Sequence, residues 1–475
     1  MLNSIVRPAA VSILSVLGRT FDIQCRNLVI DEVLHTALHM GWGSRNPKRR
    51  CRACMNAREE NRSMDCSRRE FLRRSGIALA GVALAPELVG AQTTGGTERS
   101  MAKSSKKIRI GVVGGGFGAA FHWHRDPNCI VEAVSDLRED RRKRLQDVYQ
   151  CNKPYNSLEE LIKDKDVDAV AVFTGAPDHV KHVVACMKAG KHVMSAVPAC
   201  ISMEQAEELL AAQKKTGLTY MMAETSYYHP VFMSARKLYE EGKFGEIYYT
   251  EAEYHHAGME YALWKDEKGN HTWRWAYPPM LYPTHCTSFL VGLTGERLTE
   301  VSCIGWGDGD PIMEGNTYDN NKFWNETAFF KTDKGHAFRV SINWRGAFGG
   351  CERAQWYGSR MSLFEPDPNG VGPVIRRATH EFAKDGAGYD VQQATFEPYQ
   401  TPAWAQELLP EPMRVGGGHD GAEPFLTHEF IDALANERKP AIDIHEALAY
   451  TVPGIIAHKS ALEGGKQMKV PSFDR

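Results

Sequence analysis

The feature that most constrains the fold is a glycine-rich turn that directly follows a short apolar stretch. The stretch KIRIGVV, residues 107–113, is apolar and rich in β-branched residues, and the turn GGGFGA follows at residues 114–119. A second apolar stretch, CIVEAVSD, ends at Asp136. A strand, a glycine turn, a helix and a second strand within about 30 residues predict the beginning of a parallel α/β sheet that binds a dinucleotide.

Four residues of this unit match positions that hold a dinucleotide. Gly114 permits the tight turn, Gly116 lets the backbone approach a pyrophosphate, and Ala119 takes the packing position of the motif. Asp136 ends the second strand about 20 positions after the glycines, where a carboxylate binds the ribose hydroxyls. Because a carboxylate repels a 2′-phosphate, we predict NAD as the cofactor. NADP stays possible because arginines lie nearby, at Arg138, Arg141 and Arg142.

The same alternation of strand and helix continues to about residue 228. The apolar stretches DAVAVF, KHVMSAV and TYMMAE are separated by helical patterns. Two of these helices begin with a serine that is followed three residues later by an acid or amide, Ser157 with Glu160 and Ser202 with Gln205. We therefore predict a Rossmann domain, a doubly wound parallel sheet, over residues 107–228.

From residue 229 the pattern changes to longer strand-like stretches joined by turns. These are EIYYTEAEYH, LTEVSCIGWG, ETAFFKTDKGHAFRVSINW and ERAQWYGSRMSLFE, and two helical patterns close the chain. We predict an α+β domain over residues 229–475, built on an open, largely antiparallel sheet that serves substrate binding and oligomerisation. Residues 366–421, rich in proline and glycine, are expected to be irregular surface. The exposed sheet suggests a homo-oligomer, a dimer or a tetramer.

Residues 1–106 are predicted to be an N-terminal extension, an export signal and a linker. The pair Arg68-Arg69 is followed by Phe71-Leu72, an apolar segment from Ile77 to Val89, and a small-residue end suited to cleavage. This order is typical of a twin-arginine signal, so we expect the twin-arginine export machinery as a partner. The apolar part is too short to span a bilayer. We predict a bacterial protein that is periplasmic or secreted.

Charge and ligand spacing argue against two classes of partner. The chain has 57 lysines and arginines against 59 acidic residues, a formal net charge of −2. This balance gives no net positive field that would attract a polyanion, so nucleic acid is not an expected partner. The CRAC at residues 51–54 has no second ligand pair at zinc spacing, and His122 and His124 do not share a helix face. We predict no metal site.

The sequence resembles the Gfo/Idh/MocA oxidoreductases over residues 107–473. The matching features are GVVGGGFG, His122, DAVAVFTGAPDH, AGKHVMSAVP and the final IDIHEALAYTVPGIIAHKSALEGG. The resemblance implies a Rossmann domain, a second domain whose sheet forms the floor of the substrate site, and oxidation of a sugar or polyol by a nicotinamide cofactor. It adds four cofactor-binding residues, namely Phe117, Thr174, His179 and Pro198.

Two positions depart from the dehydrogenases of that family. The sequence Ala196-Val197-Pro198 stands where most of them have Glu-Lys-Pro, whose lysine usually takes part in proton transfer. Leu281 stands where they tend to carry an aspartate, four residues before the later histidine. Both usual polar groups are therefore missing.

Three short motifs look like those of the NAD-dependent α-N-acetylgalactosaminidases of the same superfamily. They are YPTH at residues 282–285, ETSYY at 224–228 and GGHDG at 417–421. By that resemblance Tyr282, His285 and Tyr228 are active-site residues. Ala196 replaces the glutamate of the Glu-Val-Pro found in those enzymes.

The chemistry of hydride removal gives Tyr282 and His285 possible roles. Taking a hydride from a carbinol carbon requires a base for the hydroxyl proton, held beside the cofactor. Without a lysine at position 197, His285 is the first candidate because imidazole titrates near neutral pH. Tyr282 would orient the hydroxyl or relay its proton. In the alternative, Thr284 caps the following helix, and Tyr282 and His285 only pack.

An exported enzyme cannot draw on the cytoplasmic nicotinamide pool, so its cofactor should stay bound and be regenerated in place. Our main expectation is an oxidoreductase that acts on a carbohydrate or polyol through hydride transfer to a tightly bound nicotinamide. The alternative is a redox-neutral, NAD-dependent glycoside hydrolase that oxidises, eliminates, hydrates and re-reduces its substrate. The second alternative is a non-catalytic nucleotide-binding protein.

Overall fold

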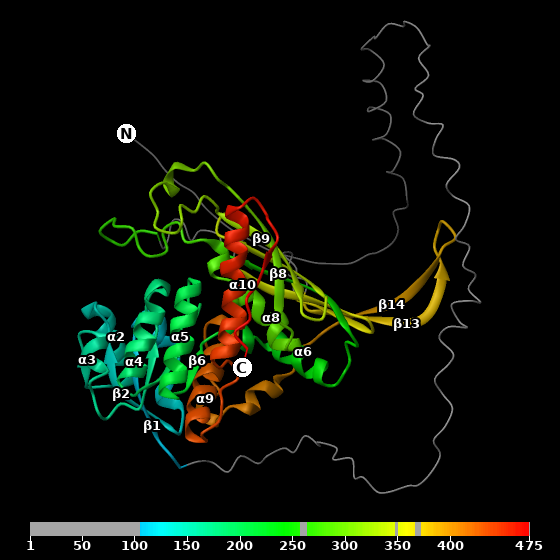
Figure 1. Ribbon diagram of the computed structural model, residues 1–475. Helices are drawn as coiled ribbons and strands as arrows, with labels where there is room; N and C mark the ends of the chain where they lie inside the picture. Colours follow the sequence, from blue (N-terminus) through cyan, green and yellow to red (C-terminus); the bar gives the residue numbers. More distant parts are fainter. Residues whose placement is uncertain (1–104, 257–263, 347–349, 366–371, 475) are drawn as a thin grey trace, which may run out of the picture. The chain divides into compact units, whose positions relative to one another are not determined.

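The computed structural model describes residues 105–256, 264–346, 350–365 and 372–474 (Figure 1). The predicted export signal lies outside these residues. Within them, no helix is long and apolar enough to cross a bilayer.

The first sheet has six parallel strands in the order β3-β2-β1-β4-β5-β6. Two crossovers run in opposite directions from β1, which is the order of a doubly wound Rossmann sheet and confirms the prediction. Its strands are β1 Ile108–Val113, β2 Cys129–Ser135, β3 Pro154–Tyr155, β4 Ala169–Val172, β5 His192–Ser195 and β6 Tyr220–Met222.

Two of the helices that cover this sheet begin where the sequence predicts. Ser157 accepts a hydrogen bond from the Glu160 amide at 3.3 Å, and Ser202 accepts one from the Gln205 amide at 3.2 Å. Both serines are therefore N-caps. The helices are α2 Glu139–Tyr149, α3 Leu158–Leu161, α4 His179–Lys188 and α5 Met203–Thr216.

The second sheet has nine strands in the order β14-β13-β12-β11-β7-β10-β9-β8-β15. Only β7 and β10 pair in parallel, so the sheet is mostly antiparallel, as predicted. Its strands are β7 Ile247–His255, β8 Leu298–Trp306, β9 Asn325–Thr332, β10 Ala337–Asn343, β11 Cys351–Gly358, β12 Met361–Phe364, β13 Val374–Lys384, β14 Asp390–Pro398 and β15 Met468–Lys469.

One face of the second sheet is covered by helices, and the other exposes apolar side chains. Helix α8, Thr284–Thr294, packs on β7 and β11, and α10, Ile444–Leu462, packs on β8. Exposed side chains include Tyr248, Ile304 and Phe329. An exposed apolar face fits the expected homo-oligomer, which stays a prediction.

The end of the chain returns to the first sheet. Helix α9, Ala422–Ala435, packs near β1, and the Thr427 hydroxyl donates to the carbonyl of Phe121. The Met222 amide at the end of β6 donates to the carbonyl of Ile442 at 3.1 Å. One apolar cluster joins residues from both parts of the sequence, among them Ile110, Met194, Phe425, Leu426 and Phe430. The predicted limits, 107–228 and 229–475, stay a prediction.

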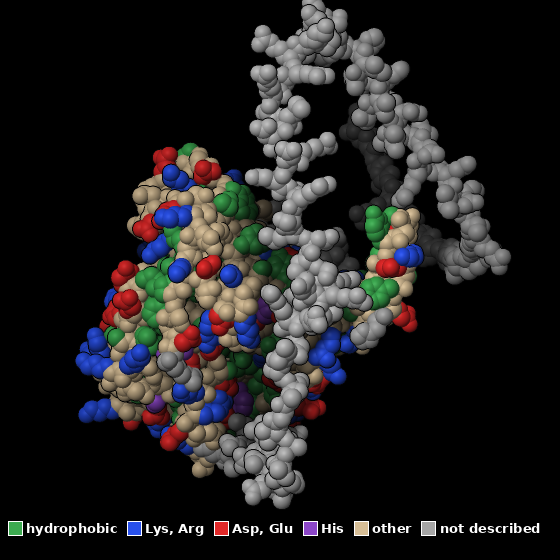
Figure 2. All heavy atoms as spheres, turned by 45° about the vertical axis from the view of Figure 1, so that its right-hand side comes forward, with side chains coloured by type: hydrophobic (Ala, Val, Ile, Leu, Met, Phe, Trp, Pro, Cys, Tyr) green, Lys and Arg blue, Asp and Glu red, His purple; other side chains and the backbone are tan. Residues whose placement is uncertain are grey.

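A hairpin formed by β13 and β14 projects from the second sheet, where the sequence analysis expects irregular surface (Figures 1 and 2). That expectation is wrong for residues 374–398. The reason is that, beyond Ile375 at its base, the arm buries little of either face, so its sequence lacks the alternation of a half-buried strand. Its exposed apolar side chains are Phe382, Tyr389, Val391 and Phe396.

A buried carboxyl group follows β12 and makes the stability of this sheet depend on pH. Glu365 is 6% exposed, and burial raises its pKa to about 8. The Ala354 amide donates to Glu365 and lowers this pKa, and Arg353 lowers it too. The carboxylates of Glu352 and Asp420 raise it further. The folded state therefore holds a proton that the unfolded chain releases near pH 4.5.

We predict that the free energy of unfolding falls between about pH 5 and pH 8, by up to about 1.4 kcal/mol per pH unit from this group. Glu365→Gln should remove this component, because the amide keeps the neutral form at every pH. Urea unfolding of both proteins at several pH values measures the difference. Glu397→Gln, an exposed change on β14, should leave the slope as it is. Equal slopes for wild type and Glu365→Gln would contradict the assignment.

Candidate active site

A continuous cavity of about 880 Å³ runs from the glycine turn to the start of α8. Its first end is formed by the residues that follow the parallel strands at their carboxyl edge, where dinucleotides bind in such sheets. Its second end is formed by Tyr254 of β7 and by Tyr282 and His285. The cavity therefore joins the predicted cofactor site to the stretch YPTH.

The glycine turn has the geometry that a pyrophosphate requires. Gly114 has φ +101°, and a Cβ there would lie 2.3 Å from the carbonyl oxygen of Phe173. At Gly116 the nearest atom to an added Cβ is a guanidinium nitrogen of Arg141 at 3.7 Å. The backbone at Gly116 is thus open to a close ligand, and the residues fit a bound dinucleotide.

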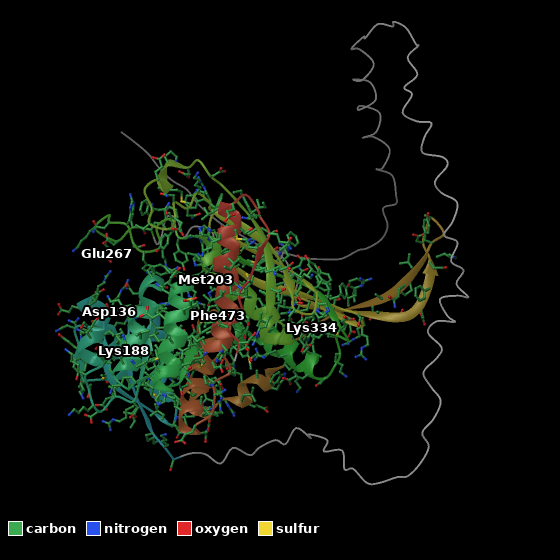
Figure 3. The ribbon with its side chains drawn as sticks, in the orientation of Figure 1. Asp136, Lys188, Met203, Glu267, Lys334 and Phe473 are labelled. Carbon is green, nitrogen blue, oxygen red and sulfur yellow. The ribbon has the colours of Figure 1, made fainter. Side chains whose placement is uncertain are left out.

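Asp136 is fixed beside this turn. Its carboxylate accepts from the Gly115 amide at 2.7 Å and from the Arg138 amide at 2.8 Å. Figure 3 shows it on the side of the first sheet that faces the loop of Glu267, whose carboxylate lies 3.3 Å from the Arg138 guanidinium. The acid stands where the ribose hydroxyls of NAD would lie. Arg141 also lines the cavity.

The structure brings five of the eight predicted cofactor residues to the cavity wall, namely Gly114, Gly116, Phe117, Asp136 and Thr174. The other three lie behind the wall. His179 is buried and bridges two loops, with Nδ1 at 2.7 Å from the Pro198 carbonyl and Nε2 at 3.0 Å from the Thr174 carbonyl. Ala119 is buried against the sheet. These residues hold the loops in place rather than facing the ligand.

Tyr282 and His285 do meet at the second end of the cavity. Their ring centroids lie 5.2 Å apart, and the ring of Tyr254 lies 4.7 Å from His285. The helix cap proposed for Thr284 is wrong, because α8 begins after Pro283 and the Thr284 hydroxyl has no hydrogen-bond partner. Tyr282 and His285 therefore line the cavity, and packing alone does not describe them.

Tyr228 does not join them. Its ring stacks on Phe425 with centroids 5.7 Å apart, and it is not among the described residues that line the cavity. Burial raises the pKa of its hydroxyl well above the usual range. A role for Tyr228 in the chemistry stays a prediction from resemblance.

Two carboxylates that the sequence analysis missed lie behind His285. Glu224 Oε1 is 2.7 Å and Glu352 Oε1 is 3.3 Å from His285 Nδ1. Burial lowers the pKa of His285, but the two carboxylates raise it more, so the net pKa is well above the usual range of histidine. Such a ring donates hydrogen bonds and is poorly suited to the expected role as a base.

The orientation of the His285 ring follows from the same contacts. Its Nδ1 edge faces the carboxylates, and the ring itself lines the cavity, so the Nε2 edge is the one directed at a ligand. A carboxylate on Nδ1 fixes both the tautomer and the direction of the ring. Glu224 follows β6 and also accepts from the Ser226 amide at 3.0 Å.

His419 is another lining residue that the sequence analysis did not assign. It belongs to the motif GGHDG, which was the available signal. Its Nδ1 lies 2.8 Å from the buried carboxylate of Glu423, and its ring lies 5.1 Å from that of Phe117. The motif at residues 417–421 thus reaches the cofactor end of the cavity.

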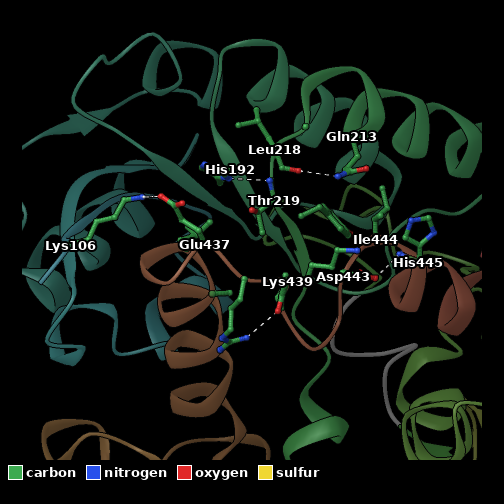
Figure 4. Close-up of a pocket in the computed structure, with 16 residues that line it drawn as sticks. Lys106, His192, Gln213, Leu218, Thr219, Glu437, Lys439, Asp443, Ile444 and His445 are labelled. Atoms are coloured by element: carbon green, nitrogen blue, oxygen red, sulfur yellow. Dashed lines mark hydrogen bonds and ion pairs between the residues drawn. The ribbon is translucent and has the colours of Figure 1, made fainter. Parts of the chain in front are cut away.

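A second cavity, of about 480 Å³, lies at the opposite edge of the first sheet (Figure 4). It is lined by His192 and Thr219, at the amino ends of β5 and β6, and by the connection between α9 and α10. Polar groups there bond to one another, as in the ion pair of Lys106 with Glu437 at 3.3 Å. Because the glycine turn lies at the carboxyl edge, this cavity is separate from the cofactor site.

We predict that Asp136→Ala weakens NAD binding by about 1 to 3 kcal/mol, because it removes the acceptor for the ribose hydroxyls and the tie to the Gly115 amide. Titration of purified protein with NAD, followed by calorimetry, measures the effect. Asp140→Ala is the matched control, since this exposed acid on α2 lies outside the cavity wall. Equal affinities of wild type and Asp136→Ala would refute the assignment.

Two family models match the chain. Residues 108–224 match the oxidoreductase family Gfo/Idh/MocA, described as an NAD-binding Rossmann fold. Residues 379–475 match the C-terminal domain of glycosyl hydrolase 109.

Several similar proteins are named after the second family, and this chain matches them over nearly their full length. A glycosyl hydrolase family 109 protein of Solibacter usitatus is 26% identical, over 86% of this chain and 97% of its own. Glycosyl hydrolase family 109 protein 2 of Akkermansia muciniphila is 23% identical, over 87% of this chain and 97% of its own.

Solved structures share the fold. Scyllo-inositol dehydrogenase of Lactobacillus casei, with bound NAD(H) and scyllo-inositol, has a TM-score of 0.57 at 15% identity, covering 77% of this chain and 99% of its own. A levoglucosan dehydrogenase in complex with NADH and levoglucosan has a TM-score of 0.61 at 17% identity, covering 77% of this chain and all of its own. This chain therefore joins a Rossmann domain of the Gfo/Idh/MocA oxidoreductase family to a C-terminal domain of the glycosyl hydrolase 109 type.

Proposed function

We propose that the protein is a redox-neutral, NAD-dependent glycoside hydrolase. The observation that carries the proposal is the single cavity that joins the glycine turn to Tyr282 and His285. The glycosyl hydrolase 109 match at the C-terminus and the relatives of that name favour this reading over net sugar oxidation, our main expectation. Ala196 and Val197 line the cavity where dehydrogenases carry a lysine, which also weakens the oxidoreductase reading.

The residues of this chain fit such a cycle. When bound, the nicotinamide would accept the hydride of a ring carbinol carbon and return it at the end. The Nε2–H of His285 would donate to the oxygen of that carbon, which draws charge from the neighbouring C–H bond and makes it more acidic. Tyr282 lies at the same end and would pass the hydroxyl proton to solvent on oxidation, and the C–H proton on elimination, and would return both in the reverse steps. Loss of the aglycone and addition of water give the keto sugar, and return of the hydride then gives free sugar with no net redox change.

The walls near Tyr282 suit a sugar. Trp273, Arg274 and His256 line this end, and the Arg274 guanidinium lies 4.2 Å from the centre of the Trp273 ring. Aromatic faces pack against the C–H groups of sugars, and polar edges bond their hydroxyls. The resemblance to α-N-acetylgalactosaminidases makes an N-acetylated amino sugar the first glycoside to test.

Export by the twin-arginine route remains part of the proposal. A cofactor restored in each cycle needs no second enzyme and no free nicotinamide pool, which suits an enzyme outside the cytoplasm. The protein would cross the membrane folded, with its cofactor in place.

We predict that the protein, with no cofactor added after purification, releases nitrophenol from a nitrophenyl α-N-acetylgalactosaminide or another member of a glycoside panel. No net reduced-nicotinamide absorbance should accumulate. In D2O the released sugar should carry deuterium on the carbon next to the anomeric carbon, because that C–H bond is broken and remade. Free sugar incubated with the enzyme in D2O is the control for later exchange. Hydrolysis without deuterium would contradict the cycle.

We predict that Tyr282→Phe lowers kcat by about 10²- to 10⁴-fold, the usual size of acid–base catalysis, with NAD affinity unchanged. The ring and its packing stay, so only the hydroxyl is lost. Tyr248→Phe, an exposed tyrosine of β7, is the matched control and should keep full activity. Full turnover by Tyr282→Phe would remove this residue from the mechanism.

A further inference from the structure

The loop GGHDG, residues 417–421, wraps around a buried carboxylate. Glu423 lies in the first turn of α9 and is 1% exposed. A Cβ on Gly417 would lie 2.8 Å from Glu423 Oε2, and a Cβ on Gly418 would lie 3.0 Å from Glu423 Oε1. These contacts are tighter than a side chain allows, so the loop passes this close to the carboxylate because both residues are glycines.

The same loop holds the ring of His419 in a fixed direction. His419 and Asp420 have φ of +44° and +54°, a left-handed conformation that is uncommon for residues other than glycine. His419 Nδ1 lies 2.8 Å from Glu423 Oε1, so this edge of the ring is bonded to the carboxylate. The His419 ring lines the cavity, and its side chain is 42% exposed. The Nε2 edge is therefore the one that a ligand in the cavity can reach.

The surroundings of Glu423 favour a positive charge on His419. Glu423 Oε2 is buried and has no hydrogen-bond partner among the described residues, and a buried carboxylate is costly unless an opposite charge balances it. His122 also feels the charge of Glu423, but burial and the charge of Arg125 lower the pKa of His122. His419 is therefore the better source of the balancing charge. A ring protonated on both nitrogens donates from Nε2.

Contacts with the first sheet place this donor beside the glycine turn. The centroid of the His419 ring lies 5.1 Å from that of Phe117, and Phe117 directly follows Gly116. The Thr427 hydroxyl of α9 donates to the carbonyl of Phe121, which lies four residues further along the same segment. The backbone at Gly116 is the part of the turn that is open to a pyrophosphate. A positively charged donor here would meet the most negative part of a dinucleotide.

We propose that His419 binds the pyrophosphate of the cofactor through Nε2, and that Glu423 is the positioning residue of this ring. The imidazolium then lies between two anions, the Glu423 carboxylate and a phosphate, and charge-assisted hydrogen bonds of this kind are strong. The pyrophosphate is held by two segments that are far apart in the chain, which slows its release. This inference rests on NAD binding, which is part of the proposed function.

Calorimetric titration of the full chain, freed of any copurified nucleotide, with NAD, ADP and adenosine tests this contact. His419→Asn removes the ring and suits the left-handed backbone, because asparagine adopts positive φ more readily than most residues. We expect about 10- to 100-fold weaker binding of NAD and ADP, which both carry a pyrophosphate, and unchanged binding of adenosine. His428→Asn is the matched control. His428 of α9 pairs with the buried Asp126 at 2.7 Å, but it is not among the described residues that line the cavity.

A double-mutant cycle separates positioning by Glu423 from its part in stability. Glu423→Gln should weaken NAD binding in the wild-type chain and have no further effect in the His419→Asn chain, because Glu423 acts on the cofactor through the ring. Thermal melting without nucleotide reports the change in stability of each chain. Equal effects of Glu423→Gln on NAD affinity in both chains would overturn the positioning role.

A further measurement uses only the wild-type chain, in case the variants do not fold. Diethyl pyrocarbonate modifies imidazole nitrogens, and tandem mass spectrometry gives the rate at each histidine. Saturating NAD or ADP should slow modification of His419 several-fold, whereas adenosine should not, and the rate at His428 should stay the same in each case.

The outcomes distinguish this inference from the proposed function. Unchanged NAD affinity in folded His419→Asn, or unprotected His419 in the presence of saturating NAD, would overturn the inference and leave the proposed function standing. Weaker binding of NAD with unchanged binding of ADP would overturn the contact with the pyrophosphate. A wild-type chain that binds no NAD would overturn both the inference and the proposed function.

Discussion

The bond between His285 and Glu224 ties the two sheets of this molecule together at the candidate active site. Glu224 follows the last strand of the parallel sheet, and His285 lies in the first turn of the helix that covers the second sheet. Both are buried, and a buried carboxylate without a partner is costly. The pair therefore fixes the position of the Tyr282 end of the cavity relative to the predicted cofactor end, which is formed by loops of the first sheet.

The features that could be predicted from the sequence are those formed by residues close together along the chain. The turn at Gly114 and the acid at Asp136 belong to one β-α-β unit, whose spacing is fixed by the fold. Tyr282 and His285 are three positions apart, so a single stretch places both. The two serine caps are equally local. In each case the residues that interact are also close along the chain.

What could not be predicted depends on residues that meet across the fold. Glu352 reaches His285 from β11, and its sequence surroundings are those of any alternating strand. Tyr228 was placed by resemblance, but its side chain turns to Phe425 of α9, a helix almost 200 residues later in the chain. The β13–β14 hairpin was not predicted because a strand pattern reports a buried face, and beyond Ile375 at its base this arm is mostly exposed.

In the proposed cycle, the absence of a lysine at position 197 changes how positive charge reaches the substrate. In the related dehydrogenases an ammonium group serves proton transfer, whereas here the wall at Ala196 and Val197 is apolar. Positive charge is instead held at His285 by the carboxylates behind it. A proton held on Nδ1 by the carboxylates leaves the Nε2–H of His285 as the donor on the cavity side. In the proposed cycle, a donor fixed in this way would stabilise an oxyanion through oxidation, elimination and reduction alike, which a base consumed in the first step would not do.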